Sequence, residues 1–219
     1  MSELGNSRVI TSNQEGVHKD LEQVVLKHLK HAFRKPYQAH TLAAFKECEK
    51  WVEQQGKPII LDSCCGVGES TYHLAKKHPE AIILGLDKSA DRLAKHPQSI
   101  ADNYRLLQVN LNDFWRLAVD ANWHLSHHYL LYPNPWPKAN HLQRRWHGSA
   151  VFPAILALGG ELELRSNWFT YIHEFARALE LAKQSCHVET FVSETSITPF
   201  ERKYWASGQK SLRLTATLK

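Results

Sequence analysis

Ile59-Ile60-Leu61-Asp62-Ser63-Cys64-Cys65-Gly66-Val67-Gly68 is the stretch of this 219-residue chain that decides its fold. The apolar run predicts a short buried strand, and the glycines predict a tight turn into a helix that ends near Lys77. A second apolar run, 81–86, leads to Asp87. An acidic residue about 20 residues beyond such glycines is placed to accept hydrogen bonds from ribose hydroxyls. The unit therefore predicts a nucleoside-binding α/β half.

The same rhythm of strand and helix continues to the end of the chain. Further strands are expected at 104–109, 127–131, 161–164, 187–192 and 212–218, with helices from Ser89 and at about 112–119, 148–158 and 168–183. This order predicts an α/β, Rossmann-like fold with a mostly parallel seven-stranded sheet. The last two strands follow each other closely, so one strand is expected to be antiparallel.

The first 56 residues have a different pattern. Residues 1–15 are polar and expected to be mobile, and helical spacing of apolar residues predicts helices at 17–33 and 38–54. We therefore expect an N-terminal helical extension, 1–56, before the main domain, 57–219.

Composition narrows the functional classes. A net charge of +5 and a pI of about 9.0 favour an anionic partner. The four cysteines show no zinc spacing, so no metal site is expected, and reduced thiols suit the cytoplasm. The N-terminus lacks the apolar core of a signal peptide, and no apolar stretch is long enough to span a membrane.

The charge of the glycine turn discriminates between nucleoside ligands. A dinucleotide site has the pattern G-x-G-x-x-G, but here Thr71 stands at the third glycine position. Asp62 would repel a pyrophosphate and would suit an ammonium group. These residues favour S-adenosylmethionine (SAM) over a dinucleotide, held by Asp62, Gly66, Gly68 and Asp87. The other interpretation is a plain strand-to-helix turn without a ligand.

A second segment, Tyr132-Pro133-Asn134-Pro135-Trp136-Pro137-Lys138, follows the strand at 127–131. Its three prolines exclude a helix and stiffen the backbone. Trp136 can stack on a base or pack as core. Four nearby cations can meet phosphate or form a solvated helix face: Lys138, His141, Arg144 and Arg145.

The spacing Asn134-Pro135-Trp136-Pro137-Lys138-x-x-His141-x-x-Arg144-Arg145 closely resembles a motif of the bacterial tRNA (guanine-N7)-methyltransferases. Ser166-Asn167-Trp168 and Thr198-Pro199-Phe200-Glu201 resemble two later segments of that family. The resemblance covers about residues 57–218. It implies SAM as the methyl donor and N7 of guanine 46 of tRNA as the acceptor.

Position by position, the resemblance also implies roles. Asp62 and Asp87 match acidic SAM ligands, and Asn110 matches an acid that contacts adenine. Asn134 and Asn167 match functional aspartates of the catalytic site. The expected substrate-binding residues are Lys138, His141, Arg144, Arg145, Asn167, Thr198 and Glu201. Of these, the arginine pair is expected to neutralise the RNA backbone.

Departures from the family pattern leave a second interpretation open. Where the family has acids, this chain has asparagines at 110, 134 and 167. It also has Asn140 in place of an arginine and Gln143 in place of a lysine. An asparagine carbonyl still accepts one hydrogen bond, but without the strength of a charge-assisted one. The alternative is thus a silent or retargeted paralogue that binds SAM or RNA. With tRNA as partner, we expect a monomer or homodimer, no obligate protein partner and no membrane.

Overall fold

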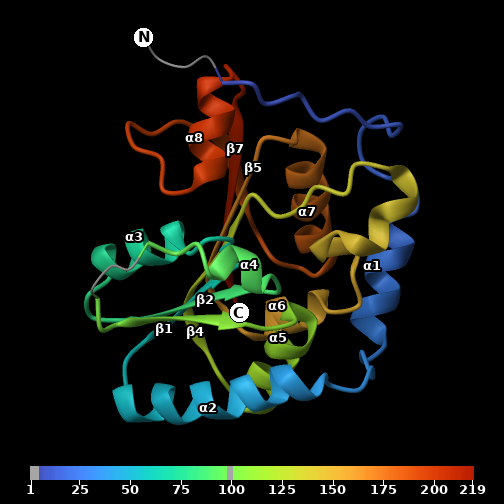
Figure 1. The fold of residues 1–219 in the computed structure, drawn as a ribbon. Helices are drawn as coiled ribbons and strands as arrows, with labels where there is room; N and C mark the ends of the chain where they lie inside the picture. Colours follow the sequence, from blue (N-terminus) through green and yellow to red (C-terminus); the bar gives the residue numbers. More distant parts are fainter. Residues whose placement is uncertain (1–4, 98–100) are drawn as a thin grey trace.

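The computed structural model describes residues 5–97 and 101–219, and its strands form one sheet of order β3-β2-β1-β4-β5-β7-β6 (Figure 1). The strands are β1 (Ile59–Ser63), β2 (Ile82–Asp87), β3 (Tyr104–Gln108), β4 (Leu125–Leu131), β5 (Gly160–Ser166), β6 (His187–Phe191) and β7 (Ser211–Leu218). The first five are parallel neighbours, and β7 is antiparallel to both β5 and β6. The predicted Rossmann-like sheet with one antiparallel strand is confirmed.

Helices connect most of the strands. They are α1 (Leu21–Lys30), α2 (Ala39–Gln55), α3 (Glu69–Lys77), α4 (Ala90–Leu93), α5 (Leu111–Asp120), α6 (Phe152–Ala157), α7 (Phe169–Leu181) and α8 (Pro199–Ala206), with 3₁₀ helices η1 (Ala139–Arg144) and η2 (Trp146–Gly148). Helix α8 is not among the predicted helices, and η1 lies where a helix face was one interpretation of the basic residues. The start signals of α8 are clear in hindsight, because the Thr198 side chain accepts from the backbone N–H of Glu201 and proline follows at the first helical position.

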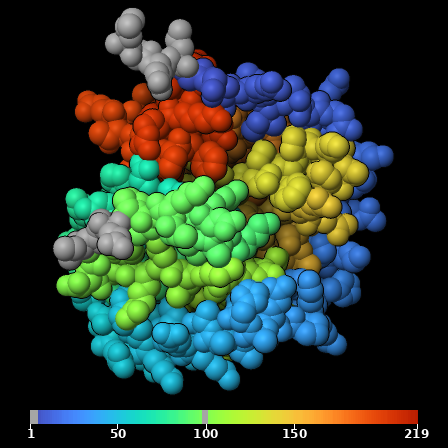
Figure 2. Space-filling model, in the orientation of Figure 1, coloured from blue at the N-terminus to red at the C-terminus, as the bar shows by residue number. Residues whose placement is uncertain are grey.

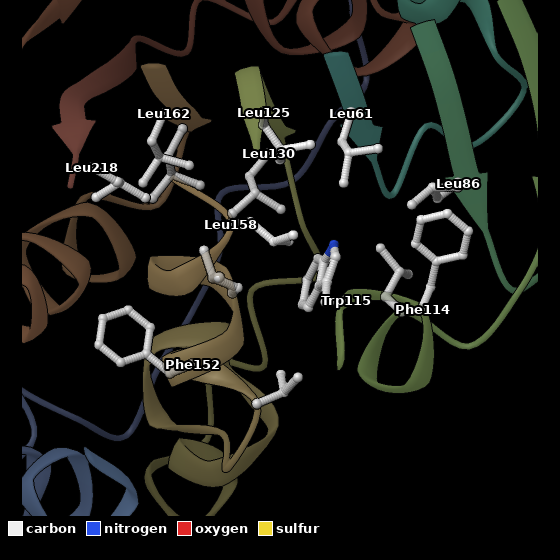
Figure 3. Packing of buried hydrophobic residues seen from close by; sticks show 14 of the residues in the cluster. Leu61, Leu86, Phe114, Trp115, Leu125, Leu130, Phe152, Leu158, Leu162 and Leu218 are labelled. Atoms are coloured by element: carbon white, nitrogen blue, oxygen red, sulfur yellow. The ribbon is translucent and has the colours of Figure 1, made fainter. Parts of the chain in front are cut away.

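The pleat of the strands divides the core between the two faces of the sheet. Ile60 of β1 packs with Leu74 of α3, whereas its neighbour Leu61 packs in the larger cluster on the opposite face. Figure 3 shows that larger cluster, in which Trp115 of α5 and Phe152 of α6 lie under the sheet residues Leu61 and Leu130.

The N-terminal helices belong to this larger core. Leu21 and Val25 of α1 and Phe45 of α2 are buried in the same cluster as the sheet residues. Residues 5–15 have no regular secondary structure, yet several of them are hydrogen-bonded to other parts of the chain, in contrast to the expected mobility. Residues 1–4 lie outside the described residues. The division of the chain at residue 56 stays a prediction.

The strand order reverses between β1 and β4, since β2 lies on one side of β1 and β4 on the other. In open α/β sheets, ligands bind beyond the carboxyl ends of the strands at such a reversal. The predicted site segments all follow strands of this edge: the glycine turn follows β1, Asp87 ends β2, and the proline segment follows β4. No described helix is long and apolar enough to cross a membrane.

Candidate cofactor and acceptor site

The glycine turn after β1 has a backbone that favours glycine. Gly66 and Gly68 have φ angles of 62° and 76°, in the left-handed region. A Cβ at Gly68 would lie 2.7 Å from Leu106 Cδ1, so this glycine allows α3 to pack against β3. A Cβ at Gly66 would meet no described atom within 4 Å, so the turn is open at Gly66. Gly68 therefore serves packing, and Gly66 leaves the turn accessible.

Asp62 lies fully buried below this turn. Its Oδ2 accepts hydrogen bonds of 2.6 Å from the hydroxyls of both Ser70 and Thr71, in the first turn of α3. Its Oδ1 is buried without a described partner. The pKa of Asp62 is raised to about 6. Burial is the largest cause and the charge of Asp87 adds to it, while the hydrogen bonds from the two hydroxyls lower it. A buried acceptor without a donor is costly unless a ligand supplies one.

Asp87 joins the glycine turn to the end of β2. One carboxylate oxygen accepts from the N–H of Gly66 at 3.0 Å, and the other accepts from the N–H of Ser89 at 2.8 Å. Each oxygen keeps a second lone pair, so Asp87 can still accept from ribose hydroxyls. The two carboxylates lie beside an open turn, with the Arg92 guanidinium 3.7 Å from Asp87, and the orphaned Oδ1 of Asp62 lacks a donor. These residues therefore fit SAM, whose methionine end carries an ammonium group.

Asn110 is placed at the same edge, but its side chain has a structural role. Its carbonyl oxygen accepts from the N–H of Asn112 at 3.0 Å and caps α5, and its amide donates to Gln38 at 3.2 Å. The adenine contact stays a prediction.

The thiols that follow Asp62 are not nucleophiles. Burial and then the charge of Asp87 raise the pKa of Cys64 to about 12, and burial also raises the pKa of Cys65. Both stay protonated at neutral pH.

The proline segment begins with Tyr132, whose hydroxyl donates to Ser211 at 2.8 Å. Asn134 is exposed, and its carbonyl oxygen accepts from the N–H of Trp136 at 3.3 Å, which closes a local turn. The Arg144 guanidinium lies 4.8 Å from the centre of the Trp136 ring, and His141 meets that ring edge-on at 5.4 Å. Trp136 is thus half-buried and packed by its own segment, so the interpretation as core is wrong, and base stacking stays a prediction.

Arg145 is fully buried, which contradicts the predicted contact with the RNA backbone. Its guanidinium donates to Glu174 of α7 at 2.6 Å and to the carbonyls of Trp136 and Lys138 at 3.2 Å. Arg145 therefore holds the proline segment against α7. The spacing of apolar residues around η1 covers too few residues to distinguish a buried arginine from an exposed one.

The other cations of the segment remain available. Lys138 and Arg144 are exposed. Partial burial and then the charge of Arg144 lower the pKa of His141. Phosphate contact by Lys138, His141 and Arg144 stays a prediction.

The late segments meet beside the ends of β5 and β7. Glu201 is fully buried, with its oxygens bound to Arg165 at 2.6 Å and to the N–H of Ile197 at 2.9 Å. Thr198 caps α8 and is also buried. Neither side chain is therefore free to meet a ligand, and their expected role in shaping the substrate site stays a prediction. Asn167 is half-buried and donates to Gln209 at 2.8 Å.

Residues from the N-terminal segment also reach this region. The Ser12 hydroxyl donates to the carbonyl of Pro137, and the N–H of Ala139 donates to Asn13 at 2.9 Å. Figure 2 shows the N-terminal segment (blue) beside both the proline segment (yellow) and the C-terminal helix (red), with the surface hollowed below them. Two surface pockets of about 530 and 280 Å³ lie elsewhere, at the β6–β7 end and between α5 and α6.

Residues 56–214 match the model of a family described as "Putative methyltransferase". The chain belongs to this methyltransferase family. Over 183 residues it is 26% identical to a tRNA (guanine-N(7)-)-methyltransferase of Geobacillus thermodenitrificans, covering 76% of this chain and 83% of the relative. A tRNA (guanine-N(7)-)-methyltransferase of a Nocardioides species is 28% identical over 174 residues, covering 71% of this chain and 66% of that relative. These relatives confirm the resemblance carried by the proline segment.

Solved methyltransferase structures share the fold. The 16S rRNA methyltransferase KamB superposes with a TM-score of 0.61 at 17% identity, covering 86% of this chain and 98% of KamB. A 16S rRNA (adenine(1408)-N(1))-methyltransferase from Catenulisporales acidiphilia, solved with SAM, gives a TM-score of 0.56 at 16% identity and covers 78% of this chain and 91% of its own. At these identities the likeness establishes the fold alone.

The sequence analysis missed one central residue, Glu174. It is fully buried and accepts from Arg145, His147, Gln14 and the N–H of His18. A signal existed in the sequence, because Glu174 occurs on the apolar face of α7 at helical spacing from Tyr171 and Ala178. An acid at such a position indicates a buried ion pair.

Proposed function

We propose that this protein transfers the methyl group of SAM to N7 of a guanine in tRNA, at position 46. The observation that carries this proposal is the pair of acids at the glycine turn, one with an orphaned buried oxygen, at the same sheet edge as the proline segment. Membership of a methyltransferase family and tRNA (guanine-N(7)-)-methyltransferase relatives support the reaction class.

The donor half of the site is formed by β1, β2 and the turn between β1 and α3. Asp62 holds the ammonium group, Asp87 accepts from the ribose, and the turn, open at Gly66 and packed by Gly68, lets the ligand approach the backbone. Asn110 faces the adenine in this proposal. Bound SAM supplies an electrophilic methyl group on a sulfonium.

The acceptor half requires no general base. Guanine N7 has a free lone pair, so no proton leaves before the methyl group is transferred, and positioning is the main demand. Asn134 and Asn167 provide carbonyl acceptors for the N–H groups of guanine. Lys138 and Arg144 meet the RNA backbone. Asparagine in place of an acid therefore weakens substrate binding without removing a chemical step.

We further propose a cytoplasmic protein that acts as a monomer or homodimer without an obligate protein partner. The four free thiols agree with a reducing compartment.

Labelled methyl transfer tests the proposal against the silent alternative. With tritiated SAM, the protein should label bulk tRNA from cells that lack a tRNA guanine-N7 enzyme. The matched control is tRNA from cells that contain the enzyme, because its acceptor is already methylated. SAM binding by calorimetry without label in either tRNA would favour the silent paralogue.

SAM binding should depend on pH through Asp62. Only ionised Asp62 accepts a charge-assisted bond from the ammonium group, and its pKa in the free protein is about 6. The affinity should be highest near pH 7, where Asp62 is ionised and the α-amino group is charged, and fall below pH 6, approaching about tenfold per unit. Calorimetry from pH 5 to 8 measures this. An affinity that is unchanged at pH 5 would contradict the assignment.

A further inference from the structure

The half-buried side chain of Gln209 connects the candidate acceptor site to the N-terminal segment. Its backbone N–H donates to the carbonyl of Tyr204 at 3.0 Å, which fixes it at the end of α8. Its side-chain Nε2 donates to the carbonyl of Ser7 at 2.9 Å, and its Oε1 accepts from Nδ2 of Asn167 at 2.8 Å. Three residues from distant parts of the chain thus form one line of hydrogen bonds.

The direction of this line is fixed from one end. The carbonyl of Ser7 can only accept, so the amide nitrogen of Gln209 must face it. The oxygen of Gln209 then faces Asn167, which must present its own nitrogen. Ser7 is itself held by a hydrogen bond from its N–H to the hydroxyl of Ser207 at 3.0 Å. The amide of Asn167 therefore cannot turn over without breaking a hydrogen bond.

With its nitrogen bound to Gln209, the Asn167 side chain has its oxygen left for another partner. Its Oδ1 accepts no hydrogen bond from any described residue and is not sealed from solvent, because Asn167 is half-buried. Asn167 therefore presents an acceptor at the end of β5. The N1–H and the 2-amino group of guanine are adjacent donors, whereas unsubstituted purine has an acceptor at N1 and no exocyclic amine.

We propose that Gln209 is a positioning residue that sets the polarity of Asn167, so that the site selects a purine with donors at N1 and at the 2-amino group. This inference rests on the proposed function, with Asn167 at the acceptor base. Gln209 also explains why asparagine suits position 167. An aspartate there would place two acceptors face to face, unless Gln209 turned and gave up Ser7.

Variants of Gln209 test the polarity directly. Gln209→Glu keeps an acceptor toward Asn167, Gln209→Lys offers only a donor and should turn the Asn167 amide over, and Gln209→Met offers neither. The control Gln184→Met alters a glutamine that accepts from the N–H of Lys219, far from the site. The readout is the ratio of kcat/KM for tRNA with guanosine to kcat/KM for tRNA with purine riboside at the acceptor position.

A neutral hydrogen bond lost in a buried site corresponds to about a tenfold preference for guanosine in the wild type. Gln209→Glu and the control should keep that ratio within about threefold, Gln209→Met should lower it, and Gln209→Lys should bring it to about 1 or below. Melting curves and SAM calorimetry show which variants are folded. If Gln209→Lys does not fold, the ratio measured for Gln209→Met tests the proposal.

An unchanged ratio in folded Gln209→Lys or Gln209→Met would overturn the role of Gln209 and leave the proposed function intact. A wild type that forms no 7-methylguanosine would overturn both.

Discussion

Replacement of Glu174 by glutamine should lower the free energy of unfolding by about 3 kcal/mol, because it removes the negative partner of a buried arginine. Burial alone would raise the pKa of Glu174, but hydrogen bonds and charge from His147 and Arg145 lower it to about 2. Burial lowers the pKa of His147, so the charged partner at pH 7 is Arg145. In a chain of this length the melting temperature should fall by about 6–12 °C.

The control is Glu180→Gln on the same helix. Glu180 is exposed and pairs with Arg177 at 2.9 Å, three residues away. An exposed pair of this kind is worth about 0.5 kcal/mol or less. Urea unfolding at pH 7.5 measures both variants. Equal losses in the two variants would show that Glu174 does not hold the proline segment and the N-terminal segment together.

Replacement of Asp62 by asparagine should have the opposite signature, a large loss of SAM binding with no loss of stability. The ionised acid is penalised by burial, so its raised pKa opposes folding above pH 6. Asparagine removes that penalty and can still accept from Ser70 and Thr71 with its one oxygen. The charge-assisted bond to the ammonium group is lost, which corresponds to a roughly 10–100-fold weaker affinity.

Calorimetry with SAM and urea unfolding at pH 8 measure this prediction. Asp91→Asn, an exposed acid on α4, is the matched control and should change neither quantity. The fall of affinity below pH 6 should also disappear in Asp62→Asn. An unchanged SAM affinity would place the cofactor elsewhere, and a loss of stability of several kcal/mol would make Asp62 a structural residue.

The sheet was predictable because its signals are local. Short apolar runs punctuated by glycines and polar turns give every strand of the sheet to within two residues. The acids at the carboxyl ends of β1 and β2 were identifiable for the same reason, since parallel strands bring these ends to one edge. The helix α8 is short, and its start signals, the Thr198 cap and Pro199, are not followed by a long apolar period that would predict a helix.

Side-chain pairing across the chain was not predictable. Arg144 and Arg145 are adjacent and chemically identical, yet one is exposed and the other is fully buried. The difference depends on Glu174, which no pattern of η1 reveals. Likewise, the contact of Gln209 with Ser7 joins residues 202 positions apart. Such contacts decide which polar residues face a ligand and which ones support the site.

The most direct test is the identity of the nucleoside that the protein forms. Transfer RNA from cells without a guanine-N7 enzyme is treated with the protein and SAM, digested to nucleosides and analysed by mass, and the modified position is mapped by cleavage at 7-methylguanosine. We predict 7-methylguanosine at position 46 and no other new methylated nucleoside. A methyl group on an exocyclic amine, on a ring nitrogen of adenine, or on no nucleoside would contradict the account.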